Sequence, residues 1–261
     1  MAKKMKRDAA AGQRDDSPAP GSMCPACGAP LGAPYHAHDG IDLHRCAACE
    51  TVYMHPLPSP ESIEGFYEDS YDGALTGYFA KVDKKLKRSR GRIKYLSRLV
   101  GSGDFLDIGS NGGFMVEAAR EHGYKAVGVE IDPVSVEYAR EHYPENEYFT
   151  GTVEQYAESG RQFDLAYCSE VIEHVPDVQG FAAATAKLLK PGAVLFLTTP
   201  DISHWRRPRA LTDWDAYCPP SHCVFFTPAS LTGLFARHGF LLRTRRLAWK
   251  PGVKLVLERV G

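Results

Sequence analysis

Four of the seven cysteines stand in two C-x2-C pairs close to the start of the chain. Cys24 and Cys27 form the first pair, Cys46 and Cys49 form the second, and eighteen residues separate the pairs. Two such turns can supply four thiolates to one tetrahedral Zn²⁺, and four sulfurs close a structural site without the nearby histidines. We therefore predict a structural zinc site in a zinc ribbon over residues 23–58, because so short a segment cannot build a stable apolar core.

A second chemical signal is a glycine-rich turn between an apolar strand and a helix. Residues 105–113 read F-L-D-I-G-S-N-G-G. Gly109 allows the chain to turn sharply out of the strand, and Gly112 and Gly113 leave room for a ligand to lie against the backbone. Glu130 ends the next apolar strand, where a carboxylate can accept both hydroxyls of a ribose. The pattern predicts a site for a ligand that carries a ribose.

Two details separate this turn from the loop of nicotinamide-dependent enzymes. The glycines are spaced G-x-x-G-G rather than G-x-G-x-x-G, and Asp107 precedes them at the end of the strand. A carboxylate repels a pyrophosphate, whereas it is compatible with a donor that carries an amino group and a sulfonium. In the alternative interpretation Asp107 only caps the loop. We favour the donor site because further motifs follow downstream.

Those motifs read F-D-L-A-Y-C-S-E-V-I-E-H-V over residues 163–175 and L-L-K-P-G-A-V-L over residues 188–195. Together with residues 107–113, and with S-H-C-V-F-F-T-P over residues 221–228, they resemble class I S-adenosylmethionine-dependent methyltransferases. The similarity is greatest to the group that contains the ubiquinone-pathway O-methyltransferases, and it covers about residues 100–245. It implies a seven-stranded sheet whose last strand runs antiparallel.

The resemblance also implies where S-adenosylmethionine binds. Asp107 and Gly109 are expected near its methionine part, and Glu130 is expected to hold its ribose. The usual acidic residue beside adenine is not obvious on the third strand, so Thr152 and Val153 take that place. The expected cofactor-binding residues are Asp107, Gly109, Ser110, Asn111, Gly112, Gly113, Glu130, Ile131, Thr152, Val153, Ser169 and Glu170.

Methyl transfer is an in-line displacement at a carbon that the sulfonium already activates. The enzyme therefore supplies positioning and, when the acceptor carries a proton, a base. Candidates for these roles follow the fourth and fifth strands, at the carboxyl edge of a parallel sheet where ligands bind. We expect Glu173, His174 and His222 to be catalytic, with either histidine as the base. A purely structural hydrogen bond explains each histidine equally well.

The segment E-V-I-E-H over residues 170–174 has a second interpretation. In small-RNA 2′-O-methyltransferases, and in some ubiquinone-pathway enzymes, a similar segment holds Mg²⁺, and His222 could be a further ligand here. Otherwise Glu173 and His174 only brace the loop that follows. We favour the interpretation without Mg²⁺, because this hard cation prefers oxygen ligands and two histidines are unusual for it.

The elements that must position these groups begin at Gly103, where short apolar strands start to alternate with helices. Strands are expected at 105–108, 126–130, 163–168, 194–198, 241–247 and 254–258, and helices at 114–122, 133–143, 181–189 and 228–238. Repeated β-α-β units with short connections specify a parallel sheet with helices on both faces. Residues 101–261 are therefore predicted to form an α/β, Rossmann-like methyltransferase domain that binds the donor.

Three other stretches frame that domain. Residues 1–22 have the composition of a disordered tail, and residues 59–100 are predicted to form a helical connector or lid. Within it, a first helix is expected to open at 59–62, and a basic amphipathic helix is expected over 81–99; its charges are typical of a solvated face but could bind RNA. Residues 200–222 have the length of a lid over the acceptor.

Side chains in these stretches leave alternatives open. The aromatic rings of Tyr71, Tyr78 and Phe79 either line the acceptor pocket or pack the ribbon and helices on the core. The arginines near Trp205 either read a carboxylate or phosphate on the acceptor or lie in a solvated loop.

The whole chain has 261 residues, a formal net charge of −1 and 44% hydrophobic residues. This balance makes a nucleic-acid partner unlikely on electrostatic grounds. No apolar run approaches about 20 residues, and no apolar segment follows the basic start of the chain, so we expect a cytoplasmic protein without a membrane partner. The sequence carries no signal for an oligomeric state.

The function predicted from these features is methyl transfer to a small-molecule acceptor. A four-cysteine ribbon joined to such a core is similar to bacterial methyltransferases of secondary-metabolite and cell-surface sugar pathways. The main alternative is a zinc-ribbon RNA methyltransferase, which the basic helix supports and the net charge opposes. A third interpretation is a non-catalytic zinc-ribbon interaction protein, against which the intact turn at 107–113 and Glu130 argue.

Overall fold

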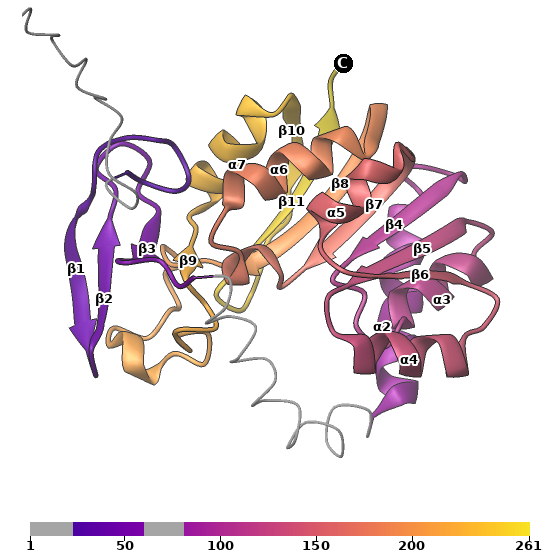
Figure 1. Ribbon diagram of the computed structural model, residues 1–261, viewed down its shortest axis with the longest axis horizontal. Helices are drawn as coiled ribbons and strands as arrows, with labels where there is room; N and C mark the ends of the chain where they lie inside the picture. Colours follow the sequence, from indigo (N-terminus) through magenta and orange to yellow (C-terminus); the bar gives the residue numbers. More distant parts are fainter. Residues whose placement is uncertain (1–22, 60–80) are drawn as a thin grey trace, which may run out of the picture.

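Two β-sheets organise the chain, whose computed structural model describes residues 23–59 and 81–261 (Figure 1). The larger sheet has seven strands in the order β10-β11-β8-β7-β4-β5-β6, and the smaller has four in the order β1-β2-β3-β9. The small sheet stands at one end of the molecule, beside the larger sheet and its helices. The expected tail, the helix start at 59–62 and the rings of Tyr71, Tyr78 and Phe79 fall wholly or largely outside the described residues.

The large sheet confirms the predicted α/β fold. Its strands are β4 (Asp104–Ile108), β5 (Lys125–Glu130), β6 (Glu147–Thr150), β7 (Phe163–Ser169), β8 (Leu189–Pro200), β10 (Phe240–Arg245) and β11 (Gly252–Arg259). Five of them, β6-β5-β4-β7-β8, pair in parallel, whereas β11 runs antiparallel to both β8 and β10. The last strand is thus antiparallel, as the family resemblance implied.

Helices cover both faces of this sheet. They are α2 (Val82–Leu96), α3 (Phe114–Glu121), α4 (Pro133–His142), α5 (Val153–Tyr156), α6 (Val178–Lys187) and α7 (Pro228–Arg237), with 3-10 turns η1 (Ala157–Ser159), η2 (Ile172–His174) and η3 (Leu211–Asp213). Buried residues of α2 and α3 pack on one face of the sheet, and those of α6 and α7 pack on the other. Since both faces are covered, the central strands are almost continuously apolar.

The boundaries of the elements differ from expectation at two places. The helix expected at 181–189 begins earlier, at Val178, because the Asp177 side chain accepts a hydrogen bond from Gly180 N and caps it. Pro191 and Gly192 were expected to separate that helix from the next strand, but they lie inside β8. The short elements β6 and α5 were not predicted, because four residues show too little periodicity.

The small sheet contains the predicted ribbon and one strand from far along the chain. Its strands are β1 (Ala33–His38), β2 (Ile41–Arg45), β3 (Val52–Met54) and β9 (Val224–Phe225). β1 and β2 form a hairpin whose turn, Asp39-Gly40, has two positive φ angles. β3 pairs antiparallel with β9, so the ribbon is joined to the rest of the protein by main-chain hydrogen bonds.

Helices α6 and α7 also hold the first cysteine turn by its backbone. Gln179 Nε2 donates to Ala26 O at 2.7 Å, and Arg237 donates to the same carbonyl. His238 Nε2 lies 2.8 Å from Gln179 Oε1 and orients that amide. Ala26 is fully buried, so this contact is a packed interface and not a chance touch of two surfaces.

Candidate functional site

The glycine turn connects β4 to α3 with a backbone that other residues could not adopt without strain. Gly109 has a φ of 75°, and Gly113, with a φ of 78°, is the N-cap of α3. A Cβ atom on Gly109 would overlap the Val171 side chain, and one on Gly113 would overlap the Tyr148 ring. The turn therefore packs tightly against neighbouring elements, as a backbone cradle for a ligand requires.

Two acids lie beside this turn, at the carboxyl ends of β4 and β5. Asp107 is buried, and burial, with the nearby charge of Glu130, raises the pKa of its carboxyl group well above the usual value. Glu130 accepts hydrogen bonds from Asn111 N at 2.8 Å and Asp132 N at 3.1 Å, while burial raises its pKa too. Both carboxylates would gain from a cationic or hydroxyl-rich ligand, which would repay their loss of water.

The structure brings most of the predicted donor residues to this one edge of the sheet. Ile131 follows β5 with its apolar side chain 43% exposed, which suits contact with a ligand. Thr152 caps α5 through a reciprocal hydrogen-bond pair with Gln155, and Val153 is buried, so both have a structural reason to be there. A role of Thr152 and Val153 beside adenine stays a prediction.

Ser169 and Glu170 are held by the end of β8. Ser169 Oγ lies 2.8 Å from Thr198 Oγ1, which lies 2.9 Å from Glu170 Oε1. Glu170 has a φ of 58°, a left-handed conformation that turns the chain out of β7. Thr198 was not among the predicted residues, although a threonine pair at the end of the apolar run A-V-L-F-L was a usable signal.

The three predicted catalytic side chains do lie together. One ligand-type atom from each of Glu173, His174 and His222 falls within 4.8 Å of the others. The two imidazole rings meet edge to face, with centroids 4.4 Å apart. His222 Nδ1 lies 2.8 Å from Ala216 O, and His174 Nδ1 lies 3.0 Å from Ser221 Oγ.

Burial governs the protonation of this cluster. Glu173 is fully buried, and this burial, with the charge of Glu170, raises the pKa of its carboxyl group to about 8. Burial also lowers the pKa of His174 to about 4 and shifts that of His222 downward. At neutral pH the histidines are therefore neutral and the Glu173 carboxyl is mostly protonated.

Only one of the two carboxylate oxygens of Glu173 has a hydrogen-bond partner among the described residues. Its Oε2 accepts a hydrogen bond from Thr199 Oγ1 at 2.8 Å, while its Oε1 is buried and has no partner among the described residues. The set of one carboxylate and two imidazoles could hold a borderline divalent cation. Glu170 is not part of this group of ligands, so the described residues do not assemble the oxygen-rich set that Mg²⁺ prefers.

Comparison with known proteins decides the family. Residues 78–244, more than half of the chain, match the sequence model of a family described as the methyltransferase domain. The chain belongs to this methyltransferase domain family. The zinc-ribbon segment, residues 23–58, lies outside the matched range.

Curated relatives match a smaller part of the methyltransferase domain. A ubiquinone biosynthesis O-methyltransferase of Bartonella tribocorum is 40% identical over 98 residues, which are 36% of this chain and 40% of that protein. The protein of the same name from Brucella ovis is 35% identical over 99 residues, with the same coverage. The chain thus spans well under half of the length of these relatives.

Solved structures share the fold of the methyltransferase domain. The 1,6-didemethyltoxoflavin-N1-methyltransferase of Burkholderia thailandensis, solved with S-adenosylhomocysteine, has a TM-score of 0.60 and 14% identity, and the match covers 88% of this chain and all of that one. An O-methyltransferase family protein from the same organism has a TM-score of 0.59 and 15% identity, covering 74% and 63%. At such identities the likeness concerns the fold alone.

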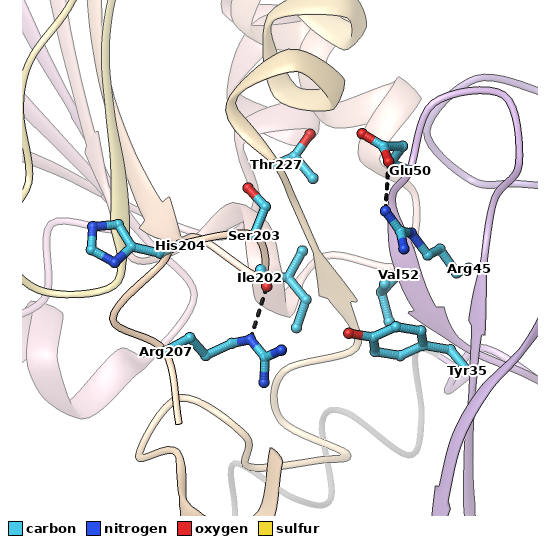
Figure 2. A pocket seen from close by; sticks show the side chains of 9 residues that line it. All are labelled: Tyr35, Arg45, Glu50, Val52, Ile202, Ser203, His204, Arg207 and Thr227. Atoms are coloured by element: carbon cyan, nitrogen blue, oxygen red, sulfur yellow. Dashed lines mark hydrogen bonds and ion pairs between the residues drawn. The ribbon is translucent and has the colours of Figure 1, made fainter. Parts of the chain in front are cut away.

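A cavity of about 230 Å³ lies between the small sheet and the methyltransferase domain (Figure 2). Its lining comprises Tyr35, Arg45, Glu50, Val52, Ile202, Ser203, His204, Arg207 and Thr227. Arg45 pairs with Glu50 at 2.5 Å, and Arg207 Nε donates to Ile202 O at 2.9 Å, so both guanidinium groups already have partners. None of Glu173, His174 and His222 lines this cavity.

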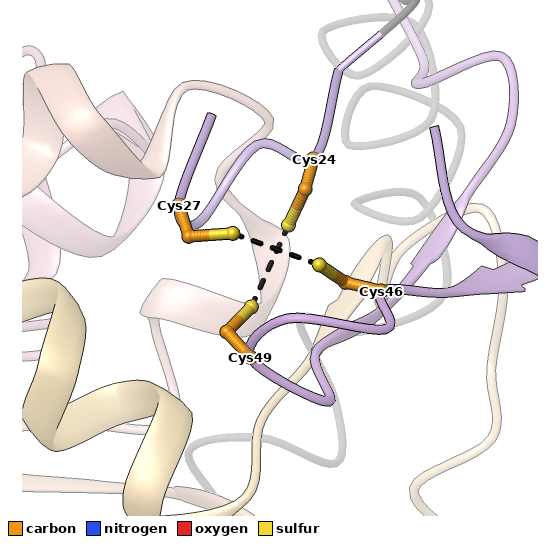
Figure 3. Close-up of side chains that lie close together, drawn as sticks. All are labelled: Cys24, Cys27, Cys46 and Cys49. Atoms are coloured by element: carbon orange, nitrogen blue, oxygen red, sulfur yellow. Dashed lines mark hydrogen bonds between the residues drawn. The ribbon is translucent and has the colours of Figure 1, made fainter. Parts of the chain in front are cut away.

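The four predicted zinc ligands converge at the tip of the ribbon (Figure 3). Cys24 Sγ lies 3.7 Å from Cys49 Sγ, and Cys27 Sγ lies 3.6 Å from Cys46 Sγ. A tetrahedron with Zn–S bonds of about 2.3 Å has edges of about 3.8 Å, so the sulfurs already stand at the spacing that Zn²⁺ imposes. The donor set thus fits a structural zinc ion.

We expect Cys46→Ser to remove this metal. The wild-type protein should carry about one zinc per chain and lose thermal stability with a strong chelator, because the ribbon has little core of its own. Cys46→Ser should purify with far less zinc. Even without chelator, it should unfold at the reduced melting temperature that the wild type shows with chelator. Metal content by mass spectrometry and thermal unfolding test this, with the exposed Cys218→Ser as the matched control. If the wild-type protein contained no zinc and were still fully stable, the zinc site would be contradicted.

A second prediction concerns the buried Glu173. Its pKa is about 8 in the folded protein and about 4.5 when unfolded, so the folded state loses stability as pH rises between these values. Gln mimics the protonated carboxyl, so Glu173→Gln should raise the melting temperature more at pH 8 than at pH 5. Thermal unfolding of both proteins at both pH values measures the difference. An equal effect at both would show that Glu173 is ionised in the folded protein.

Proposed function

We propose that this protein transfers a methyl group from S-adenosylmethionine to a small-molecule acceptor. The observation that carries the proposal is the left-handed glycine turn beside two buried acids, Asp107 and Glu130, in a chain of the methyltransferase domain family. A degenerate, non-catalytic domain would have no need to keep two carboxyl groups buried in this way.

The charges of the site support this choice of donor. S-adenosylmethionine supplies a methyl group on a positively charged sulfur. Asp107, whose carboxyl group is costly to ionise alone, gains a counter-charge from the ammonium and sulfonium of such a donor. Glu130 is oriented by two backbone N–H groups, and its remaining lone pairs can accept the ribose hydroxyls. A dinucleotide would bring phosphates to the same carboxylates and be repelled.

Other residues at this edge complete the proposed donor site. The residues assigned to it, besides Asp107 and Glu130, are Gly109, Ser110, Asn111, Gly112, Gly113, Ile131, Thr152, Val153, Ser169 and Glu170. Gly109 and Gly113 give the turn its left-handed backbone, while Ile131 offers an exposed apolar surface.

For the acceptor we propose His222 as the base. The carbonyl of Ala216 can only accept, so His222 Nδ1 carries the ring hydrogen and Nε2 carries the lone pair. As the acceptor atom bonds to the methyl carbon, the carbon–sulfur bond breaks and its electron pair stays on sulfur. The proton of the acceptor then passes to His222 Nε2. His174, which packs against this ring, is the alternative base, and Glu173 positions the pair.

The proposed acceptor class is a small molecule of secondary-metabolite or sugar-type biosynthesis. Its support is the combination of the ribbon with this core, together with relatives named for ubiquinone biosynthesis and for N1-methylation of 1,6-didemethyltoxoflavin. The RNA-methyltransferase alternative rests on the basic helix α2. We do not assign Mg²⁺ to the acceptor site, since its ligands are rich in nitrogen.

The donor site is tested by binding of S-adenosylhomocysteine in a calorimeter. Glu130→Ala should weaken binding roughly 10- to 100-fold, because hydrogen bonds to a charged group contribute about 1.5–3 kcal/mol. Glu141→Ala, an exposed acid on α4, is the control and should bind as the wild type does. Unchanged binding by Glu130→Ala would contradict the ribose assignment.

The base is tested by following S-adenosylhomocysteine formation with a panel of phenols, hydroxylated sugars and amines. His222→Asn should lower kcat by about 10²-fold or more and leave S-adenosylhomocysteine binding unchanged. In the wild type the rate should fall only at a pH below the ordinary imidazole value of about 6.5, because burial lowers the pKa of His222 and only the neutral ring accepts a proton. His142→Asn, on the surface of α4, should leave the rate unchanged. A wild-type rate for His222→Asn would reject this base.

A further inference from the structure

Three large apolar side chains stand exposed in two neighbouring loops. Trp205 is 77% exposed in the loop after β8, and Leu247 and Trp249 are 89% and 70% exposed in the loop between β10 and β11. The two indole rings meet edge to face with centroids 6.5 Å apart, and His204 Nε2 lies 3.1 Å from Ala248 O, which ties the loops together. Exposed apolar groups that cluster in this way mark a binding surface.

These loops are also strongly basic. Residues 203–209 and 246–251 contain five Lys and Arg and no Asp or Glu, in a chain whose net charge is −1. The Arg206 guanidinium lies over both indoles, 4.3 Å from the Trp249 ring centre and 5.3 Å from that of Trp205. Among the described residues, neither Arg206, Arg246 nor Lys250 forms an ion pair. The described part of this surface therefore carries cations without an ion-pair partner around its apolar centre.

Helix α2 extends this charge. The Arg246 guanidinium lies 3.9 Å above the ring of Tyr95, near the end of α2. The exposed residues along one side of the helix include Lys84, Lys87, Arg88 and Lys94. Spacings of three, four and seven residues place most of these on one side, so α2 adds a basic stripe that reaches the two loops.

We propose that Trp205, Arg206, Arg246, Leu247, Trp249 and Lys250, here named the basic aromatic patch, dock the protein on an anionic phospholipid bilayer. Tryptophan is favoured where an apolar medium meets water, because its ring is apolar and its N–H needs a polar partner. Leu247 gains by entering the acyl region, and the cations gain from lipid phosphates. The proposal does not depend on methyl transfer.

A nucleic acid fits the same patch less well. Single-stranded bases bind by stacking on open aromatic faces. Here Arg206 lies over both indoles, and Trp205 also stacks on His204, so much of the ring surface is already in use. Leu247, the most exposed of the three apolar residues, has no role in contacts with bases or phosphates. The apolar centre thus favours lipid over a polyanion in water.

The position of the patch gives the docking a consequence. β10 is antiparallel to β11, which is antiparallel to β8, so β10 ends at the same edge of the sheet as β8, β4 and β5. The basic aromatic patch and the glycine turn therefore lie at one edge. Docking would turn this edge toward the bilayer, where an amphipathic acceptor is concentrated. Among the described residues no helix is long and apolar enough to cross a membrane, but docking on its surface requires none.

Vesicle binding by the full chain tests the proposal. Wild-type protein is mixed with vesicles of phosphatidylglycerol and phosphatidylcholine in equal parts, or of phosphatidylcholine alone, at low and high salt. It should sediment with the anionic vesicles, weaken with salt and not sediment with neutral ones. Two of the three tryptophans lie in the patch and Trp214 is buried, so the fluorescence should shift to the blue on binding and be quenched by brominated lipid.

Paired variants separate the apolar part from the charged part. Leu247→Ser with Trp249→Ser, and Arg206→Gln with Lys250→Gln, should each lower the vesicle partition coefficient by roughly tenfold or more, since each basic residue near the surface contributes about fivefold. The controls are Met23→Ser with Leu31→Ser on the ribbon, and Lys125→Gln with Lys187→Gln, which should bind as the wild type does. Thermal unfolding checks that each variant folds.

Three results would overturn the proposal. One is no sedimentation of the wild type with anionic vesicles, and another is binding that the patch variants do not alter. The third is that the wild type does not bind vesicles but binds single-stranded RNA tightly, and that Arg206→Gln with Lys250→Gln abolishes this RNA binding. This result would assign the patch to nucleic acid. If a paired variant fails to fold, the quenching of wild-type tryptophans by brominated lipid still decides whether Trp205 and Trp249 enter the bilayer.

Discussion

The pairing of β3 with β9 is the interaction on which the positions of Glu173, His174 and His222 depend. Met54 N donates to Cys223 O at 2.9 Å, and Cys223 N donates to Glu173 O at 2.9 Å. A continuous main-chain path thus runs from the ribbon, through the start of β9, to the 3-10 turn that carries Glu173 and His174. His222 directly precedes Cys223, so its ring is placed by the same path.

This arrangement gives the ribbon a physical role in the fold. The four cysteines lie at one end of a small sheet, and the strand at the other side of that sheet belongs to the segment that carries His222. Backbone carbonyls of the first cysteine turn are also held by Gln179 and Arg237 on α6 and α7. The family match begins only at residue 78, so the ribbon lies outside the matched domain and is joined by these contacts to the segment that carries His222.

The proposed donor site depends instead on the burial and the charge of two carboxyl groups. Asp107 and Glu130 follow neighbouring parallel strands, and both have a raised pKa because water is largely excluded from them. Such a pair is unfavourable in the protein alone and becomes favourable when a ligand supplies positive charge and hydroxyl groups. Glycine at 109 and 113 lets this turn pack closely against the neighbouring elements, because any side chain there would overlap Val171 or Tyr148.

Local sequence determined the features that rest on spacing and periodicity. The C-x2-C pairs, the G-x-x-G-G turn after an apolar strand, and the alternation of strands and helices were all legible, because each depends on residues close together in the chain. The tertiary structure alone decided what joins them: the pairing of β3 with β9 and the grouping of Trp205 with Trp249. Each of these contacts joins segments that are distant in sequence, and no local pattern encodes such a contact, because it forms only when the sheet brings the ends of its strands to a common edge.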